Sequence, residues 1–258
     1  MELRAEGIGH RYGALDVLDG IDLSVREGEI LAVIGPSGCG KSTLLGILGG
    51  LIRPTAGRAA IVGDAPQGCL NALTYVFQDF ALLPWRSVAG NVGLALEHHP
   101  LSRGERHRRI ADALALTGLA DFADAYPKQL SGGMRQRVGI ARAIVVRPAV
   151  LLMDEPLSAL DAQTRELLQE ELLAIWARER TTTVYVTHNL MEALRLADRI
   201  AVLSRRPGRL KDLIEVPVPR EMRGEPGHAA ALTALHDRLW QSIRPEAAAA
   251  DREIVDAA

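Results

Sequence analysis

The stretch that most restricts the fold is EILAVIGPSGCGKSTLLGIL, residues 29–48. Its first part is continuously apolar and β-rich, which is typical of a strand covered on both faces. Its last part reads as a helix that ends at Gly49 and Gly50, because a glycine inside a helix costs about 1 kcal/mol. The segment RPTAG, residues 53–57, is the expected following turn. The glycine-rich middle therefore predicts a tight loop that joins a buried strand directly to a helix.

The rest of the chain alternates between short apolar strands and helices. Residues 2–25 alternate polar and apolar side chains around the turn-like segments YGALD and LDG, as half-exposed antiparallel strands do. Further strands are predicted at 73–78, 149–155, 181–188 and 199–204. A long helix is predicted from Asp161 to about Arg178, with Leu168, Leu172 and Ile175 on one apolar stripe. This alternation predicts an α/β fold with a largely parallel sheet.

Length and composition limit the classes of function. A chain of 258 residues that is 48% hydrophobic can form one large domain, or a domain with a subdomain. No apolar run approaches the roughly 20 residues that cross a bilayer, and the charged start MELRAEG lacks a secretory segment, so we expect a cytoplasmic chain. Cys39 and Cys69 form no disulfide framework. A formal net charge of -2 predicts no general attraction to nucleic acid.

The glycine-rich loop matches the phosphate-binding pattern G-x-x-x-x-G-K-[ST] in the strand-to-helix context that this pattern requires. Its glycines let backbone N–H groups converge on phosphate oxygens, and the positive end of the helix dipole favours an anion. Lys41 adds a positive charge, and Ser42 can ligate Mg²⁺. A glycine-rich turn without a ligand is the alternative interpretation. The candidate nucleotide-binding residues of the loop are Gly35, Pro36, Ser37, Gly38, Cys39, Gly40, Lys41, Ser42 and Thr43.

An acidic pair follows the predicted strand VLLMDEP. Four apolar residues place Asp154 and Glu155 at the carboxyl end of a buried strand, where open α/β sheets hold ligands. Asp154 would assist Mg²⁺, and Glu155 is placed to polarise a water molecule for attack on a terminal phosphate. The alternative is a strand end whose acids are only solvated.

A second helix start suits an anion. In the segment 129–148, Ser131 stands at an N-cap position, Gly132 and Gly133 free the backbone, and a helical pattern continues until Pro148. Taken alone, this pattern also fits an ordinary capped helix.

Two further helix starts carry capping-box patterns. These are Ser102 with Glu105, and Asn189 with Glu192. Four arginines follow Ser102 and are predicted to form a solvated helical face, with a contact to lipid headgroups as the alternative. They are Arg103, Arg106, Arg108 and Arg109.

Taken together, the three motifs GPSGCGKST, LSGGMRQR and VLLMDEP resemble those of the ATP-binding subunits of ABC transporters. The resemblance runs from Tyr12 to about Arg209 in the family's order. It implies a P-loop ATPase core with an N-terminal antiparallel β subdomain and an inserted helical subdomain at about 84–147. The ATPase domain would span 1–225. A C-terminal helix and a tail that is disordered beyond Pro245 would occupy 226–258.

The resemblance implies roles that the residues alone leave open. Gln78 matches the glutamine that senses Mg²⁺ and the attacking water, and His188 matches the histidine that contacts the γ-phosphate of ATP. Tyr12 aligns with the aromatic residue that stacks on adenine. The segment 158–161, which ends at Asp161, matches the part that contacts the opposite subunit. Without the other family motifs, a histidine at a strand end or a tyrosine in a turn is more often a structural residue.

The resemblance also implies partners. Two copies would pack head to tail, so that Ser131 to Gly133 of one copy close over ATP held at Lys41 of the other. A separate membrane permease would bind the pair at the inner membrane's cytoplasmic face, with a solute-binding protein as an indirect partner and no nucleic acid. The expected permease contact is the segment 79–92, where three large side chains are either exposed for the permease or part of the core. They are Leu82, Leu83 and Trp85.

The sequence around these motifs is most similar to the nitrate, sulfonate and taurine importer branch. This implies ATP-driven dimer closure that powers import of a small anionic nutrient. An importer of a pyrimidine-type nutrient, an exporter, and an ABC ATPase that acts on DNA or ribosomes remain alternatives. Only 90 positions separate Lys41 from Ser131, which leaves no room for the long coiled coil of repair relatives.

Overall fold

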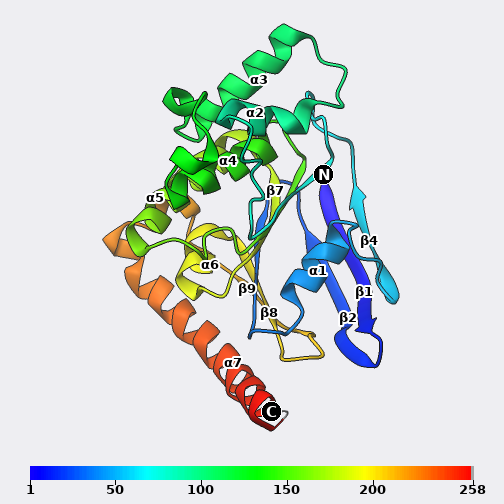
Figure 1. The fold of residues 1–258 in the computed structure, drawn as a ribbon. Helices are drawn as coiled ribbons and strands as arrows, with labels where there is room; N and C mark the ends of the chain where they lie inside the picture. The colour runs from blue at the N-terminus through cyan, green and yellow to red at the C-terminus, as the bar shows by residue number, and fades with distance from the viewer. Residues whose placement is uncertain (257–258) are drawn as a thin grey trace. The chain divides into compact units, whose positions relative to one another are not determined.

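A computed structural model describes residues 1–256 of the chain, and side chains as far as residue 246 (Figure 1). The chain divides into two compact units. The first comprises Met1–Asp64 together with the chain from Thr182 onward, and the second is Ala65–Thr181.

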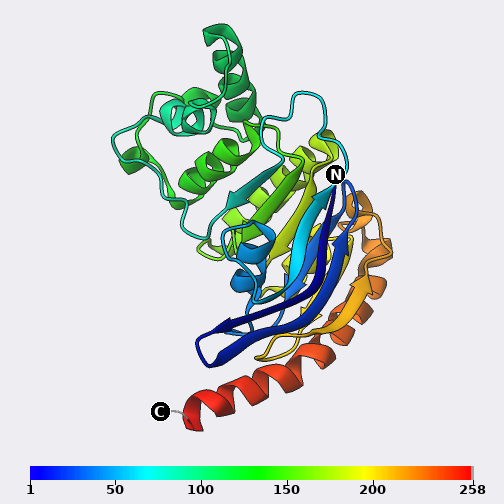
Figure 2. The ribbon, with the colours of Figure 1, turned by 90° about the vertical axis from the view of Figure 1, so that its right-hand side faces the viewer.

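The first unit contains a three-stranded antiparallel sheet, in which β1 is central (Figure 2). Its strands are β1 (Glu2–Tyr12), β2 (Leu15–Val25) and β4 (Ala56–Val62). Buried side chains such as Leu3, Ala5 and Ile8 alternate with exposed ones along β1, which confirms the antiparallel prediction for residues 2–25. The segment LDG lies inside β2 rather than at a turn. The pairing of β1 with β2 shifts register between Ile8 and His10, which marks a β-bulge. Gly20 lies at this point of β2 and has a φ of +60°.

A second, mostly parallel sheet of the first unit runs in the order β7-β3-β8-β9. Its strands are β3 (Ile30–Ile34), β7 (Thr182–Val186), β8 (Arg199–Leu203) and β9 (Leu210–Glu215). All five residues of β3 are buried, as its unbroken apolar sequence predicts. The antiparallel strand β9 was not predicted, and neither was β4, because β4 contains no buried residue and β9 contains only one, Ile214.

Among its described residues, the first unit has three α-helices. They are α1 (Lys41–Leu48), α6 (Leu190–Leu196) and α7 (Ala229–Asp256). Gly49 ends α1, as predicted. The helix α7, red in Figure 1, contacts α6 and β8 and buries Leu239. It continues through Pro245 to Asp256, so the predicted disorder beyond Pro245 is not what the structure has there. Of that predicted tail, residues 257–258 lie outside the described residues.

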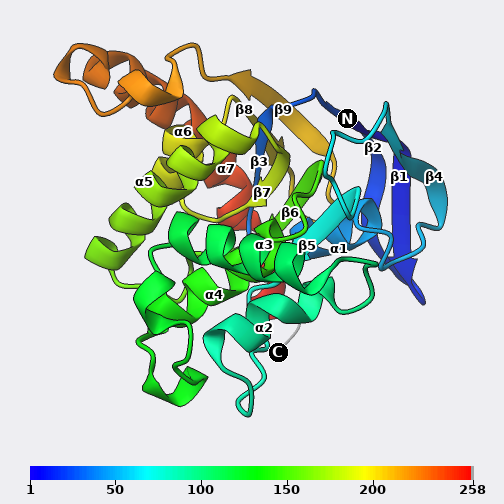
Figure 3. The same cartoon turned by 90° about the horizontal axis from the view of Figure 1, so that it is seen from above.

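The second unit contains the parallel pair β5 (Leu73–Val76) and β6 (Val150–Asp154) and a group of helices. The helices are α2 (Val88–Gly93), α3 (Arg103–Leu116), α4 (Gly132–Ile144) and α5 (Ala162–Glu179), with short 3₁₀ turns η1 (Leu94–Leu96), η2 (Ala120–Phe122) and η3 (Pro127–Gln129). Figure 3 shows α2, α3 and α4 packed side by side. The predicted long helix is α5, and its stripe of Leu168, Leu172 and Ile175 is buried.

Within residues 1–256, no helix combines the length and apolarity needed to cross a membrane.

Candidate nucleotide-binding and hydrolysis site

The phosphate loop of the first unit curls around the side chain of Lys41. The lysine is only 7% exposed, and its ammonium donates to the backbone carbonyls of Gly35 at 3.0 Å and Pro36 at 3.1 Å. The loop leaves the buried strand β3 and enters α1 at Gly40, whose φ of +102° suits glycine alone. A cationic group is thus fixed at a helix N-terminus, which is the arrangement that receives phosphate.

Close packing explains two glycines of the loop. A side chain at Gly40 would lie 2.7 Å from Leu18 Cδ2, and one at Gly35 would lie 2.9 Å from Cys39 Sγ and 3.0 Å from the carbonyl of Leu203. Cys39 itself is buried, and burial raises the pKa of its thiol. The cysteine therefore supports the loop as a small apolar group.

The residues that follow β7 lie at the same edge of the sheet as the phosphate loop. β3 and β7 are parallel neighbours with Val33 opposite Val186, and Thr187 N–H donates to the carbonyl of Val33 at 3.2 Å. His188 comes next and is exposed. The structure thus brings the predicted γ-phosphate ligand to the edge that carries Lys41.

The predicted capping box after His188 is only half correct. Asn189 Oδ1 accepts from the backbone N–H groups of Met191 and Glu192, as an N-cap does. The Glu192 side chain does not complete the box. It is 4% exposed and accepts from Tyr185 Oη at 2.6 Å and from the Thr187 hydroxyl. The sequence could not reveal this network, because both partners belong to the preceding strand segment.

Tyr12 lies at the end of β1, beside the hairpin turn, and is 51% exposed. The ring of His10 lies nearly perpendicular to that of Tyr12, with a centroid distance of 4.6 Å. The tyrosine thus has an aromatic neighbour and remains half exposed.

In the second unit, the parallel strands β5 and β6 bring three predicted residues to one sheet edge. Gln78 follows β5, and Asp154 and Glu155 end or follow β6. The Ser158 hydroxyl donates to the Glu155 carbonyl at 2.9 Å and accepts from Gln78 Nε2 at 3.4 Å. Ser158 thus ties the glutamine to the backbone of the acidic segment.

Sequence reasoning missed Tyr75, whose hydroxyl donates to Asp154 Oδ2 at 3.3 Å. Burial and the charge of Asp154 raise the pKa of this tyrosine, whose hydroxyl is already protonated at neutral pH and so donates to the carboxylate. No signal in the sequence indicates this contact, because it depends on how β5 pairs with β6, where Tyr75 lies opposite Leu152.

Glu155 adopts a left-handed φ of +43°, which is uncommon for a residue other than glycine. Such a conformation costs on the order of 1 kcal/mol and is concentrated at functional positions.

The helix α4 follows the N-cap Ser131, as predicted, and is called the signature helix below because it carries most of the segment LSGGMRQR. Ser131 Oγ accepts from Met134 N–H at 3.2 Å, and its hydroxyl proton can still be donated elsewhere. A side chain at Gly133 would lie 2.7 Å from Thr164 Cγ2, on the first turn of α5. Asp161 caps that turn through the backbone and hydroxyl of Thr164, and these hydrogen bonds lower the pKa of Asp161.

The arginines after Ser102 and the large side chains of the segment 79–92 are each only partly exposed as predicted. Arg109 is buried, not solvated, because Nη2 donates to the carbonyl of Gly68 at 3.0 Å and Nε pairs with Glu105. The predicted solvated face thus applies to Arg103 and Arg108, which are exposed. In the segment 79–92, Leu82 and Leu83 are half-buried, whereas Trp85 is 70% exposed.

A glycine-rich loop wrapped around a buried lysine, between a buried parallel strand and a helix, defines a phosphate-loop nucleotide-binding protein. Comparison with protein families gives a match to the ABC transporter model over residues 18–158, which is more than half of the chain. The chain therefore belongs to the ABC transporter family.

Relatives and solved structures agree with this assignment. The aliphatic sulfonates import ATP-binding protein SsuB 1 of Mesorhizobium japonicum is 46% identical over 236 residues, which cover 91% of this chain and 87% of that protein. The bicarbonate transport ATP-binding protein CmpD of Synechococcus elongatus is 44% identical over 211 residues, covering 81% and 76%.

Two solved structures are similar to this chain over 84% of its length and over the whole length of their own chains. One is a dimeric bacterial ABC transporter cassette, with a TM-score of 0.72 and 32% identity. The other is a post-hydrolysis cassette bound to ADP and phosphate, with a TM-score of 0.71 and 31% identity. The chain is an ATP-binding subunit of the ABC type with the fold of an ATP-hydrolysing cassette.

Proposed function

We propose that this chain powers an importer of small anionic nutrients, with the sulfonate, taurine or nitrate class as cargo. The observation that carries the proposal is the buried Lys41 ammonium in the phosphate loop, in a chain whose relatives include a sulfonate importer subunit and a bicarbonate transport subunit. Both cargoes are small anions. ATP hydrolysis by two copies would close the dimer and move the permease.

The loop residues bind the phosphates of ATP. Lys41 exchanges its two carbonyl partners for β- and γ-phosphate oxygens, and the backbone N–H groups at the start of α1 face the remaining charge. Tyr12 stacks on the adenine, which contributes about 1–3 kcal/mol to binding.

The chemistry of three side chains fits Mg²⁺. Ser42 supplies a hydroxyl, Gln78 an amide oxygen and Asp154 a carboxylate, and Mg²⁺ prefers such oxygen ligands together with substrate phosphates and water. Among the described residues there is no cluster of three or more acidic, histidine or cysteine side chains, so a metal caged by protein alone is not expected there. Bound Mg²⁺ would neutralise phosphate charge.

Glu155 orients and polarises the attacking water, and His188 hydrogen-bonds to the γ-phosphate. The link from Gln78 through Ser158 to the backbone of Glu155 supports a role for Gln78 in sensing the occupied site. Tyr75 keeps the Asp154 carboxylate oriented. The residues Ser131, Gly132, Gly133 and Asp161 act across the dimer, where the Ser131 hydroxyl is donated to the partner's bound nucleotide.

The permease contact is assigned to the segment 79–92. Trp85 is strongly exposed, and a groove of about 220 Å³ lies next to the start of this segment. Phe77, Phe80 and Leu94 contribute its apolar lining. An apolar helix end of the permease suits such a groove. The chain would then work as a peripheral subunit at the cytoplasmic face of the inner membrane.

Uptake of labelled taurine, an alkanesulfonate and nitrate tests the proposal in cells that carry the native chain or Glu155→Gln. We expect the variant to keep ATP binding and to lose uptake of one of these anions, because the amide cannot polarise water. Glu166→Gln, an exposed glutamate on α5, is the matched control and should transport normally.

Unchanged uptake of all three anions, with a purified native chain that hydrolyses ATP, would refute the anion-importer proposal. A pyrimidine-type nutrient or an exporter would then be the better assignment. Normal hydrolysis by Glu155→Gln would refute the role of Glu155 without touching the cargo.

A further inference from the structure

The exposed Trp85 sits in a tight turn. The Arg86 N–H donates to the carbonyl of Leu83 at 3.1 Å, which closes a four-residue turn with Pro84 and Trp85 at its centre. Proline fixes the backbone at the first central position and leaves Trp85 at the tip, where it is 70% exposed.

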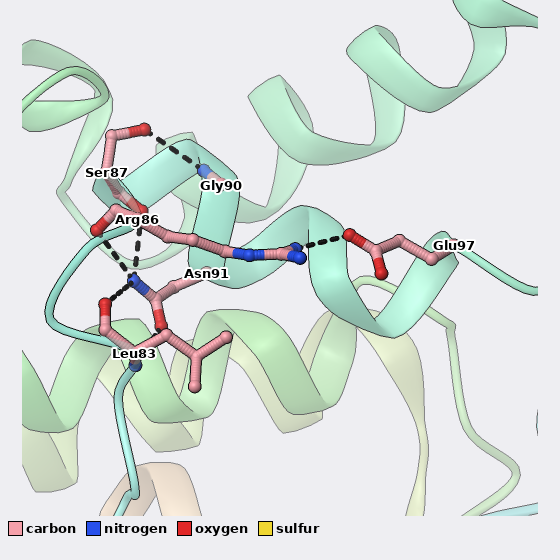
Figure 4. Close-up of polar contacts among 6 residues, drawn as sticks. All are labelled: Leu83, Arg86, Ser87, Gly90, Asn91 and Glu97. Atoms are coloured by element: carbon pink, nitrogen blue, oxygen red, sulfur yellow. Dashed lines mark hydrogen bonds and ion pairs between the residues drawn. The ribbon is translucent and has the colours of Figure 1, made fainter.

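The buried side-chain amide of Asn91 holds this turn through hydrogen bonds to its backbone. Asn91 of α2 is fully buried, and Figure 4 shows its side chain directed at the turn. Its Oδ1 accepts from Leu83 N–H at 2.8 Å. Its Nδ2 lies 3.1 Å from the carbonyl of Leu83 and 3.0 Å from the carbonyls of Arg86 and Ser87. Both ends of the turn are therefore fastened to a single side chain.

Further contacts brace the same segment on either side. Before the turn, the Arg142 guanidinium of α4 donates to the carbonyls of Phe80 and Ala81. After it, the Arg86 side chain pairs with Glu97, as Figure 4 shows, and this bond lowers the pKa of Glu97. Among the described residues of the segment 79–92, polar side chains thus brace both flanks of the turn, and Trp85 is the strongly exposed large apolar side chain.

The exposed Trp85 forgoes the stabilisation that burial of its large apolar surface would give, and its turn is held by the hydrogen bonds of a buried amide. Tryptophan is enriched at the energetic centres of interfaces, and a side chain already ordered before binding avoids part of the entropic cost of association. We propose that Asn91 is a positioning residue that holds Trp85 in the orientation in which it binds the permease. This inference rests on the proposed function, which assigns the permease contact to this segment.

The first measurement follows the mobility of Trp85 by time-resolved fluorescence anisotropy. Trp240 is exposed and is replaced by phenylalanine, whereas Trp176 is buried and adds only a constant background. Asn91→Asp is nearly isosteric but turns a carboxylate oxygen toward three carbonyl oxygens. We expect the fast-depolarising amplitude to rise about twofold or more in this variant.

The matched control is Ser87→Ala, which removes the N-cap hydrogen bond to Gly90 N–H from the same helix but leaves the Asn91 amide in place. It should leave the mobility of Trp85 unchanged. Asn91→Ser, which buries no charge and cannot reach the far carbonyls, replaces Asn91→Asp if that variant does not fold. Native-like Trp85 anisotropy in folded Asn91 variants overturns the inference.

The second measurement is the affinity of the chain for permease subunits that copurify with the native protein. We expect a loss of about tenfold in Asn91→Asp, equal to about 1.4 kcal/mol, and no loss in Ser87→Ala. Mobile Trp85 with unchanged permease affinity would support the positioning of Trp85 by Asn91 but would overturn the assigned permease contact. The two results therefore separate this inference from the proposed function.

Discussion

At the scale of single residues, Gly40 shows how one absent side chain permits the phosphate loop. Its φ of +102° lies outside the region that other residues adopt, and a Cβ would meet Leu18 Cδ2 at 2.7 Å and the Val17 carbonyl at 3.2 Å. Gly38 also has a positive φ, of +74°, but a Cβ there would meet open space. A substitution at Gly38 therefore introduces backbone strain alone, whereas one at Gly40 introduces strain and a steric clash.

We predict that Gly40→Ala lowers the free energy of unfolding by about 2–4 kcal/mol, because strain and overlap add. Gly38→Ala should cost only about 1–2 kcal/mol, which is the strain of a left-handed alanine. Urea unfolding of both variants checks this difference. Equal losses would show that the packing of Gly40 against β2 contributes nothing.

Glu192 is the second decisive residue, because its buried carboxylate accepts from both Tyr185 and Thr187. Glu192→Gln keeps the shape but replaces one acceptor oxygen by a donor. We expect a loss of about 1–3 kcal/mol in the free energy of unfolding, measured by urea titration. Met191→Ala, on the exposed neighbour, should cost a few tenths of a kcal/mol. A native-like Glu192→Gln would contradict the importance of this network.

At the scale of elements, ion pairs connect α7 to β9, and α7 also buries Leu239. Lys211 Nζ lies 2.8 Å from Glu246 Oε1, and Arg238 pairs with Asp212 at 3.2 Å. The Lys211 hydrogen bond, followed by the Arg205 N–H, lowers the pKa of Glu246. This part of the docking is therefore pH-dependent.

We predict that Glu246→Gln lowers the free energy of unfolding at pH 7 by about 0.2–1 kcal/mol, the usual range for a partly exposed ion pair. Because the folded pKa is depressed, the stabilisation is present above the unfolded value of about 4.3 and is lost as the pH falls through the folded pKa. Urea titrations should therefore show the native and variant curves converging as the pH falls below the folded pKa of Glu246. Asp237→Asn, on the exposed side of α7, is the control, and a gap that persists in acid would exclude this ion pair as its cause.

At the scale of the whole molecule, the phosphate loop and the signature helix each supply half of a nucleotide site if two copies pack head to tail. A structure of a related cassette is dimeric, which supports this arrangement. We predict that Lys41→Ala loses most ATP binding, and that Ser131→Arg binds ATP but does not hydrolyse it. A mixed dimer of the two variants should regain up to about half of the native rate, because one composite site is intact.

ATPase assays on tagged, copurified mixed dimers measure this recovery, with each variant alone as the control. Absence of recovery in verified mixed dimers would count against the head-to-tail arrangement.

The amino-acid sequence by itself determined the local features of this protein. The strand, glycine-rich loop and helix around Lys41, the cap Ser131, the start of α5 near Asp161 and the buried stripe of α5 follow from neighbouring residues, so pattern and propensity were enough. The strands β4 and β9 were missed because their stability depends on partners elsewhere in the chain.

Only the tertiary structure decided what the polar side chains do away from these motifs. In the sequence, Arg109 is one of four similar arginines. In the structure it is buried and donates to the carbonyl of Gly68. The sequence showed Asn91 only as a residue of a predicted contact segment, although its amide binds three backbone positions at once. Hydrogen bonds of this kind depend on where separate segments meet in space. No local pattern encodes them. Here they hold the backbone around Trp85, whose side chain is 70% exposed.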